Sequence, residues 1–118
     1  MSRRALGASG DLREGGAGLC FELAPTVPAF VVRHQGRVRA WINRCPHRGT
    51  RLDWEPGEFF EEAGSHLVCA SHGAVFQPHD GLCIGGPCRG ARLQAVPVIE
   101  EGGQIWLEPG HRVPSGAP

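Results

Sequence analysis

Hydrophobic residues fall in short runs along this chain, and most runs are bounded by turn residues such as Gly and Pro. Short runs that are rich in β-branched and aromatic residues are typical of strands, and none shows the longer period of a helix. Residues 34–37 join two such runs and predict a hairpin. The runs predict strands over residues 20–23, 29–33, 38–42, 66–69, 74–76, 82–84, 93–96, 98–99 and 105–107.

Long loops separate some of these strands, over residues 43–65 and 77–92, and only residues 53–62 could hold a helical turn. Gly and Pro are frequent, at 18 and 10 residues, which favours tight turns between strands over long helices. The pattern therefore predicts an all-β fold, with one small antiparallel domain over residues 19–108.

The two ends of the chain carry little of this pattern. Residues 1–18 are rich in Gly, Ala and Arg and predict a flexible N-terminal segment, and residues 109–118 predict an irregular C-terminal tail. Ser2-Arg3-Arg4 is similar to the start of a twin-arginine export signal, but polar residues and glycines follow where such a signal is apolar. Without a run of about 18 apolar residues, we expect no membrane association and a cytoplasmic protein.

Composition limits the classes of function. The 118 residues allow one domain. Basic and acidic residues number 12 each, so the formal net charge is zero and no nucleic-acid partner is indicated. The five cysteines are an odd number, which in a reducing compartment favours metal or redox chemistry over a disulfide framework.

Two short elements each combine a cysteine with a histidine. Cys45 and His47 form a C-x-H element, and after 21 further residues Cys69 and His72 form a C-x2-H element. Each element follows or ends a predicted strand, so both lie on loops whose tips can converge. Two such loops can offer two sulfurs to one iron and two nitrogens to another, which is the ligand set of a Rieske [2Fe–2S] centre.

Two other interpretations compete with this one. The four residues could be scattered core cysteines and surface histidines, although two matched mixed elements, each with a glycine soon after its histidine, are hard to obtain by chance. Two Cys and two His also suit tetrahedral zinc, in a structural module for protein interaction. Zinc modules usually pair like ligands within one element, whereas each element here is mixed, which favours iron.

The sequence around both elements resembles the bacterial Rieske-type ferredoxins. The resemblance rests on residues 41–50, Trp-Ile-Asn-Arg-Cys-Pro-His-Arg-Gly-Thr, and on residues 67–88, from Leu-Val-Cys-Ala-Ser-His-Gly to Gly-Gly-Pro-Cys. It implies an antiparallel β-sandwich with a small cluster-binding subdomain of two ligand loops and a proline loop at residues 85–87. It also implies one [2Fe–2S] cluster per chain, with the inner iron on the two cysteines and the outer iron on the two histidines.

The resemblance further implies a function. A Rieske-type ferredoxin is a soluble one-electron carrier between a reductase and a terminal oxygenase or reductase, so these redox proteins are the expected partners. Such a carrier has no substrate-transforming site of its own. An alternative is a small Rieske-type subunit of a larger oxidoreductase, as in assimilatory nitrite reductases. Those subunits can lack cluster ligands, whereas this sequence keeps all four.

Five arginines lie next to the expected cluster tip in the sequence. Arg44, Arg48 and Arg51 bracket the first ligand loop, and Arg89 and Arg92 follow the proline loop. They predict a basic collar that steers an acidic docking surface of a partner towards the cluster. The alternative is that these arginines only keep the surface soluble.

The cluster potential is expected to be low. High-potential Rieske proteins place a Ser and a Tyr hydroxyl two and four residues after the second histidine, where they hydrogen-bond the cluster and a cysteine sulfur. The matching positions here hold Ala74 and Phe76, and the chain contains no Tyr. We therefore expect a midpoint potential near the lower end of the Rieske range, about −150 mV rather than about +300 mV.

The other cysteines and histidines lie outside the two elements. Cys83 and Cys88 flank the proline loop and could form a disulfide, which a reducing compartment disfavours. Cys20 is expected to be a small buried apolar residue on an early strand. The remaining histidines are interpreted as surface or turn residues: His34, His66, His79 and His111.

Overall fold

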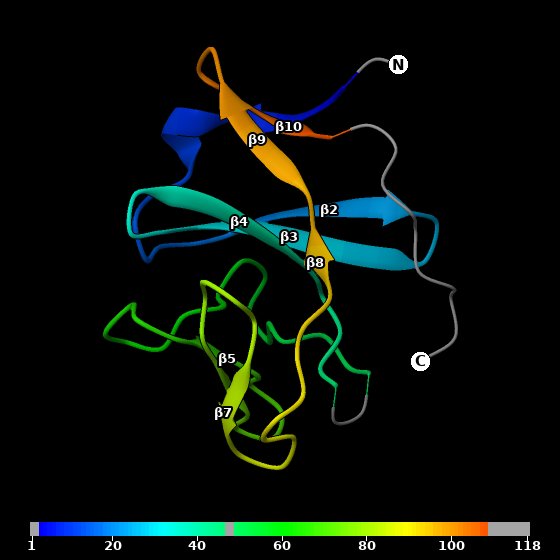
Figure 1. The fold of residues 1–118 in the computed structure, drawn as a ribbon, viewed down its shortest axis with the longest axis vertical. Helices are drawn as coiled ribbons and strands as arrows, with labels where there is room; N and C mark the ends of the chain where they lie inside the picture. The colour runs from blue at the N-terminus through cyan, green and yellow to red at the C-terminus, as the bar shows by residue number, and fades with distance from the viewer. Residues whose placement is uncertain (1–2, 47–48, 109–118) are drawn as a thin grey trace.

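The structure is a computed structural model that describes residues 3–46 and 49–108, and a four-stranded antiparallel sheet crosses its middle (Figure 1). β3 (Val27–His34) and β4 (Arg37–Ile42) of this sheet form the predicted hairpin, in which His34 pairs with Arg37. Gln35 and Gly36 at its turn have φ values of 53° and 76°, as a two-residue turn between twisted strands requires. The strand order is β2-β3-β4-β8, formed by Leu19–Ala24, Val27–His34, Arg37–Ile42 and Ala95–Val96.

A second antiparallel sheet lies above the first in Figure 1, with the strand order β1-β10-β9. Its strands are Arg4–Ala8, Gln104–Leu107 and Val98–Glu101. β1 and the 3₁₀ turn Ser9–Asp11 fall where the sequence led us to expect a flexible segment. β1 is an edge strand with no fully buried residue, so its pairing with β10 needs little of the apolar pattern that marks the other strands.

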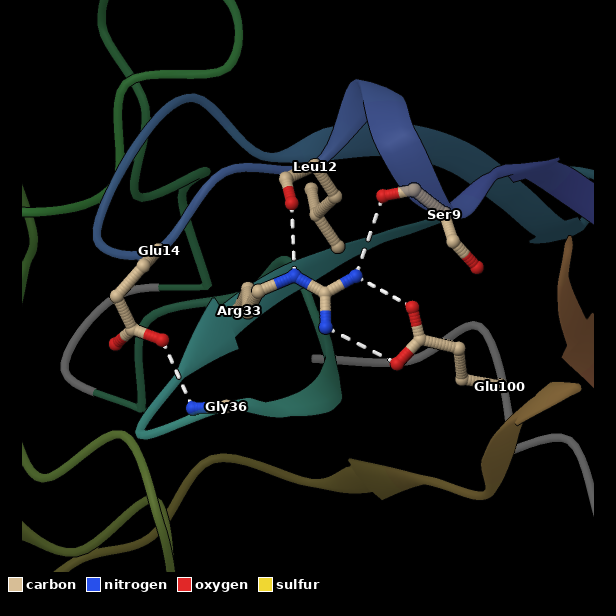
Figure 2. Close-up of polar contacts among 6 residues, drawn as sticks. All are labelled: Ser9, Leu12, Glu14, Arg33, Gly36 and Glu100. Atoms are coloured by element: carbon tan, nitrogen blue, oxygen red, sulfur yellow. Dashed lines mark hydrogen bonds and ion pairs between the residues drawn. The ribbon is translucent and has the colours of Figure 1, made fainter. Parts of the chain in front are cut away.

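The N-terminal segment is also held by one arginine on β3 (Figure 2). Arg33 donates from Nε to the carbonyl of Leu12 over 2.8 Å and from Nη2 to the carbonyl of Ser9 over 3.2 Å. Its Nη1 and Nη2 also bind both carboxylate oxygens of Glu100 on β9, and this bidentate contact lowers the pKa of Glu100. Glu14 accepts both backbone N–H groups of the β3–β4 turn. A single side chain therefore joins β3, β9 and the segment after β1.

A third, smaller sheet forms the lower half of the molecule in Figure 1. Its order is β5-β6-β7, from Leu67–Val68, Val75–Phe76 and Cys83–Gly85. Each of these strands is short and connects directly to a turn or loop. This sheet and its loops form the subdomain that the sequence predicted beside the larger sheets.

The four-stranded sheet separates two hydrophobic cores, and alternate residues of β3 face opposite ways. Val31 packs with Ile42 and Ile105 towards the β1-β10-β9 sheet. Phe30 packs instead with Phe59 and other residues of the small subdomain, and the two rings stack with centroids 3.8 Å apart. β3 thus reads as a continuous apolar run because both its faces are buried.

These features confirm the predicted fold class, an antiparallel β-sandwich with a small subdomain that carries loops. Every strand predicted from the sequence is present, with ends that differ by a few residues. Across residues 3–46 and 49–108, no helix has the length and apolar character that a membrane crossing needs.

Candidate metal centre

Two backbone hydrogen bonds join the described ends of the first ligand loop, Cys45 on one side and Gly49 and Thr50 on the other. The N–H of Cys45 donates to the carbonyl of Thr50, and the N–H of Gly49 donates back to the carbonyl of Cys45, each over 2.7 Å. Gly49 has a φ of 74°, which a residue with a side chain rarely adopts. His47, the predicted ligand in this loop, lies outside the described residues.

The second ligand loop repeats this backbone geometry between β5 and β6. The N–H of Cys69 donates to the carbonyl of Ala74 over 2.8 Å, and the N–H of Gly73 donates to the carbonyl of Cys69 over 2.9 Å. Gly73 has a φ of 73°, close to the value at Gly49. The two cysteines therefore occupy the same position in two matching turns.

A third turn of the same kind, without a cysteine, spans residues 77–82. Gln77 donates to the carbonyl of Leu82, and Gly81, with a φ of 73°, donates back to Gln77. Its sequence Gln-Pro-His-Asp-Gly matches the Cys-Pro-His-Arg-Gly of the first loop at three positions. Gly81 packs closely on the ring of Trp41, so this turn contacts the four-stranded sheet. The turn geometry thus comes from the backbone and its glycine, and the cysteine adds the chemistry.

Three of the predicted ligands lie in the described part of the chain, and they differ in burial. Cys45 and Cys69 are 1% and 0% exposed and belong to one hydrophobic core. His72, three residues beyond Cys69, is exposed. The arrangement puts thiols inside, where a charged thiolate is stabilised by a metal rather than by water, and an imidazole at the surface.

A buried asparagine braces the two ligand loops, and the sequence analysis did not identify it. Asn43 accepts the N–H of Leu52 over 2.8 Å through Oδ1, and it donates to Asp53 over 2.9 Å through Nδ2. These bonds tie together the residues before and after the first loop. The carbonyl of Leu52 in turn accepts the N–H of Ala70 in the second loop over 2.9 Å. In the sequence, the sign of this brace was that Asn43 is a polar residue directly after the strand predicted over residues 38–42.

The proline loop covers the second ligand loop from one side. A Cβ atom on Gly86 would lie 2.8 Å from the Cα of Ala74 and 3.1 Å from the carbonyl oxygen of Gly73. Gly86 has a φ of 89°, so both the contact and the backbone conformation require glycine here. This position agrees with the one expected for the proline loop.

Cys88 leads from the proline loop back towards the first ligand loop. Its Sγ lies 3.1 Å from the Sγ of Cys83, and its thiol also interacts with the thiol of Cys45. Burial raises the pKa of the Cys88 thiol to about 12, and the neighbouring Cys83 and Cys45 sulfurs add to this rise.

Arg48 of the expected collar lies outside the described residues, and the other four arginines lie in different surroundings. Arg44 donates to the carbonyl of Thr26 in the β2–β3 turn, and Arg51 lines a shallow pocket with residues of β2 and β3. Arg92 lies 3.9 Å from the carboxylate of Asp80. Arg89 donates to the carbonyl of Ile84 at the start of the proline loop. Among the described residues, Arg89 is thus the member of the collar most directly placed at the predicted tip.

Outside the loops, the structure departs from the sequence interpretation at Cys20 and His34, and His111 lies outside the described residues. Cys20 is exposed rather than buried, with its Sγ 3.7 Å from Asp53. Partial burial and the nearby Asp53 carboxylate raise the pKa of its thiol. His34 is half-buried at the end of β3, and its ring centroid lies 6.3 Å from that of Phe60. His66 and His79 lie beside the carboxylates of Glu61 and Asp80 near the surface.

The donors fit a binuclear iron–sulfur cluster. A [2Fe–2S] cluster of the Rieske kind takes two thiolates on one iron and two imidazoles on the other. Within the part of the chain that the structure describes, Cys45, Cys69 and His72 supply three donors of these two types. An all-β domain whose paired loops carry buried thiols and an exposed imidazole is suited to such a cluster.

The sequence profile of the Rieske [2Fe-2S] domain matches residues 4–100. The chain therefore belongs to the Rieske [2Fe–2S] domain family, and its cofactor is a [2Fe–2S] cluster. The match begins within β1, in agreement with the place of that strand in the fold.

Relatives fall into two groups. Oxidoreductase NdmD of Pseudomonas putida is 37% identical in an alignment 90 residues long that covers 70% of this chain. The chain spans 14% of the length of that relative. Among solved structures, apo dicamba monooxygenase is 28% identical with a TM-score of 0.67, over 93% of this chain and 34% of that one.

Small ferredoxins form the second group. The ferredoxin of carbazole 1,9a-dioxygenase from Nocardioides aromaticivorans IC177 has a TM-score of 0.74 at 23% identity, over 92% of this chain and 99% of that one. A Sphingomonas yanoikuyae B1 ferredoxin has a TM-score of 0.73 at 20% identity, over 91% and 98%. At these identities the likeness establishes the fold.

Proposed function

We propose that this domain is a one-electron carrier with a low-potential Rieske cluster, which passes electrons between a reductase and a terminal oxygenase or reductase. The observation that carries the proposal is the pair of matching turns, each with a buried cysteine at its first position. The [2Fe–2S] cluster supplies the ability to accept and release one electron. The protein holds it, keeps water from its sulfur ligands and presents its histidine side to a partner.

The proposed ligands are Cys45 and Cys69 on the inner iron and His47 and His72 on the outer iron. Burial of both thiols supports the inner role, because a thiolate held away from water is stabilised by iron. Exposure of His72 supports the outer role, because an imidazole at the surface shortens the path of an electron to a docked protein. His47 takes its role from its place in the first of the two matching turns.

Two observations support a free carrier. This chain covers 99% and 98% of the length of the two small ferredoxins whose folds superpose on it. One solved structure is a complex of reduced oxygenase and oxidized ferredoxin in carbazole 1,9a-dioxygenase, and it superposes over 95% of this chain with a TM-score of 0.75. We propose partners of the same kind for this chain, and a cytoplasmic location.

A second candidate function is a Rieske domain within a larger oxidoreductase. The relative from Pseudomonas putida favours it, because this chain corresponds to 14% of that protein. Both candidates use the same cluster and differ in whether the redox partner is a separate protein. Capture of a separate reductase and terminal oxygenase by the purified protein would support the carrier and contradict the fixed domain.

The experiment that tests the site is metal and sulfide analysis of the purified protein and two variants. The wild type and Cys20→Ser, which changes an exposed cysteine outside the loops, are expected to contain equal amounts of iron and acid-labile sulfide. Cys69→Ser is expected to lose both. Full iron content in Cys69→Ser, or zinc in the wild type, would contradict the proposal.

A further inference from the structure

Two thiols lie in contact at the base of the proline loop. The Sγ atoms of Cys83 and Cys88 are 3.1 Å apart, and neither cysteine is in a disulfide. Cys83 is buried at the start of β7, whereas Cys88 is partly exposed. A disulfide needs an S–S distance of about 2.05 Å, so the two sulfurs must approach by only about 1 Å to form one.

The backbone keeps the two residues together in either state. The N–H of Cys83 donates to the carbonyl of Ala91 over 2.8 Å, and the N–H of Gly90 donates to the carbonyl of Cys83 over 2.9 Å. The N–H of Ala91 also donates to the carbonyl of Cys88 over 2.9 Å. These three bonds close the loop at its base, so the thiols stay adjacent without a covalent link.

We propose that Cys83 and Cys88 form a reversible intramolecular disulfide, with a small-molecule disulfide of the glutathione type as the oxidant. The sulfur of Cys88 loses its proton and attacks one sulfur of the oxidant, and the first glutathione thiolate leaves and takes up that proton. The sulfur of Cys83 then attacks the Cys88 sulfur in the same way and releases the second glutathione as a thiol. The cysteine pair gives up two electrons and two protons, and one oxidised glutathione becomes two reduced molecules.

The surroundings of this pair favour a reversible bridge over a permanent one. The bridge would close a ring of few residues, and a short ring gains little stability from a cross-link. Partial exposure of Cys88 gives a small thiol or disulfide access to the bond. Burial disfavours a thiolate but not a neutral disulfide, so it slows the exchange without opposing the product.

The bridge would act on the loop that covers the proposed cluster site, and this consequence rests on the ligand role proposed for Cys45. In the dithiol state Cys83 donates its S–H to the carbonyl of Gly85, and Cys88 lies beside Cys45. Oxidation removes both S–H donors and fixes the two ends of the segment that holds Gly86 against Ala74. The dithiol and disulfide forms therefore differ next to a proposed iron ligand.

Differential alkylation of the cluster-loaded protein tests the proposal. The protein is equilibrated in buffers with increasing ratios of oxidised to reduced glutathione, its visible spectrum is recorded, and free thiols are trapped by acid quench and alkylation. Peptide mass spectrometry then reports each cysteine separately. Cys83→Ala serves as the matched control, because it keeps Cys88 and removes its partner, and the exposed Cys20 reports general oxidation.

The expected result is that Cys83 and Cys88 lose their free thiols together and to the same extent at every ratio, while the visible spectrum of the cluster is retained. In Cys83→Ala, Cys88 is expected to remain a thiol or to carry glutathione. The proposal is overturned if both thiols stay free while Cys20 is oxidised, or if the bridge forms only after the cluster spectrum has disappeared. A preparation without iron would instead contradict the proposed function, and the alkylation pattern is read independently of it.

Discussion

The contact between the proline loop and the second ligand loop can be tested by adding one methyl group at Gly86. In Gly86→Ala the new Cβ would lie 2.8 Å from the Cα of Ala74 and 3.1 Å from its nitrogen, both backbone atoms that cannot rotate away. The φ of 89° adds a second cost, because alanine disfavours positive φ by about 1–2 kcal/mol. Overpacking of a close contact adds about 1–3 kcal/mol. The proline loop is therefore expected to move away from the second ligand loop.

Gly90→Ala is the matched control, because it separates the two costs. Gly90 follows the proline loop and has a φ of 94°, but a Cβ there would meet no atom within 4 Å. Its variant should bear the backbone cost alone, about 1–2 kcal/mol of unfolding free energy. Gly86→Ala should lose about 2–5 kcal/mol, since overpacking adds to the same backbone cost.

The assay combines denaturant unfolding with the rate at which an iron chelator bleaches the visible absorption of the cluster. Gly86→Ala is expected to bleach several-fold faster than the wild type, because the displaced loop admits water and chelator to the proposed sulfur ligands. Gly90→Ala should bleach at close to the wild-type rate. Equal bleaching rates and equal destabilisation in the two variants would refute the idea that the proline loop seals the site through Gly86.

Three further predictions concern the scaffold, the potential and the charge at the tip. Arg33→Met should lower the unfolding free energy by about 1.5–3 kcal/mol at neutral pH. Because Arg33 lowers the pKa of Glu100, this loss of stability should shrink as the pH falls below 4.5. Denaturant unfolding that shows the same loss at every pH would contradict the prediction. Voltammetry should give a midpoint potential of about −150 mV, and Phe76→Tyr should raise that potential if the new hydroxyl reaches a cluster sulfur. A wild-type potential above about +100 mV would contradict the idea that the missing hydroxyl groups keep the potential low. Arg89→Glu should slow oxidation of the reduced protein by the anion ferricyanide at low salt, with Arg13→Glu as an exposed control in the N-terminal segment. Equal rates in the two charge variants would remove Arg89 from the tip.

The sequence predicted most of the strands, because their apolar runs are what the two cores require. β3 is the clearest case, since Phe30 and Val31 face different cores and both must be apolar. β1 was missed for the opposite reason. It is an edge strand held by backbone pairing with β10 and by the nearby contacts of Arg33, and neither leaves a hydrophobic pattern in residues 4–8.

The candidate site was predictable where residue type alone defines the chemistry. The spacing predicted Cys45, Cys69 and His72 as ligands, which stays a prediction; the structure shows the two cysteines buried and His72 exposed. The brace formed by Asn43 could not be predicted, because it depends on distances between loops that spacing does not set. The sequence suggested that Cys83 and Cys88 could lie close enough for a disulfide, and the structure shows two free thiols 3.1 Å apart.

The collar shows the same limit. Arginines adjacent to the expected tip in sequence turn towards different surfaces, so Arg44 reaches the β2–β3 turn while Arg89 donates to Ile84 beside the proline loop. Position in the sequence therefore predicted that arginines lie near the ligand loops, but not which surface each side chain faces.

The central claim is a [2Fe–2S] cluster with two cysteine and two histidine ligands, and pulsed electron paramagnetic resonance of the reduced protein tests it most directly. Nitrogen nuclei couple strongly to the unpaired electron only when imidazole binds the iron that carries it. The account predicts two such nitrogen couplings in the wild type, and the loss of one of them or of the whole cluster in His72→Ala. A reduced cluster without strong nitrogen coupling, or a His72→Ala protein with both couplings intact, would contradict it.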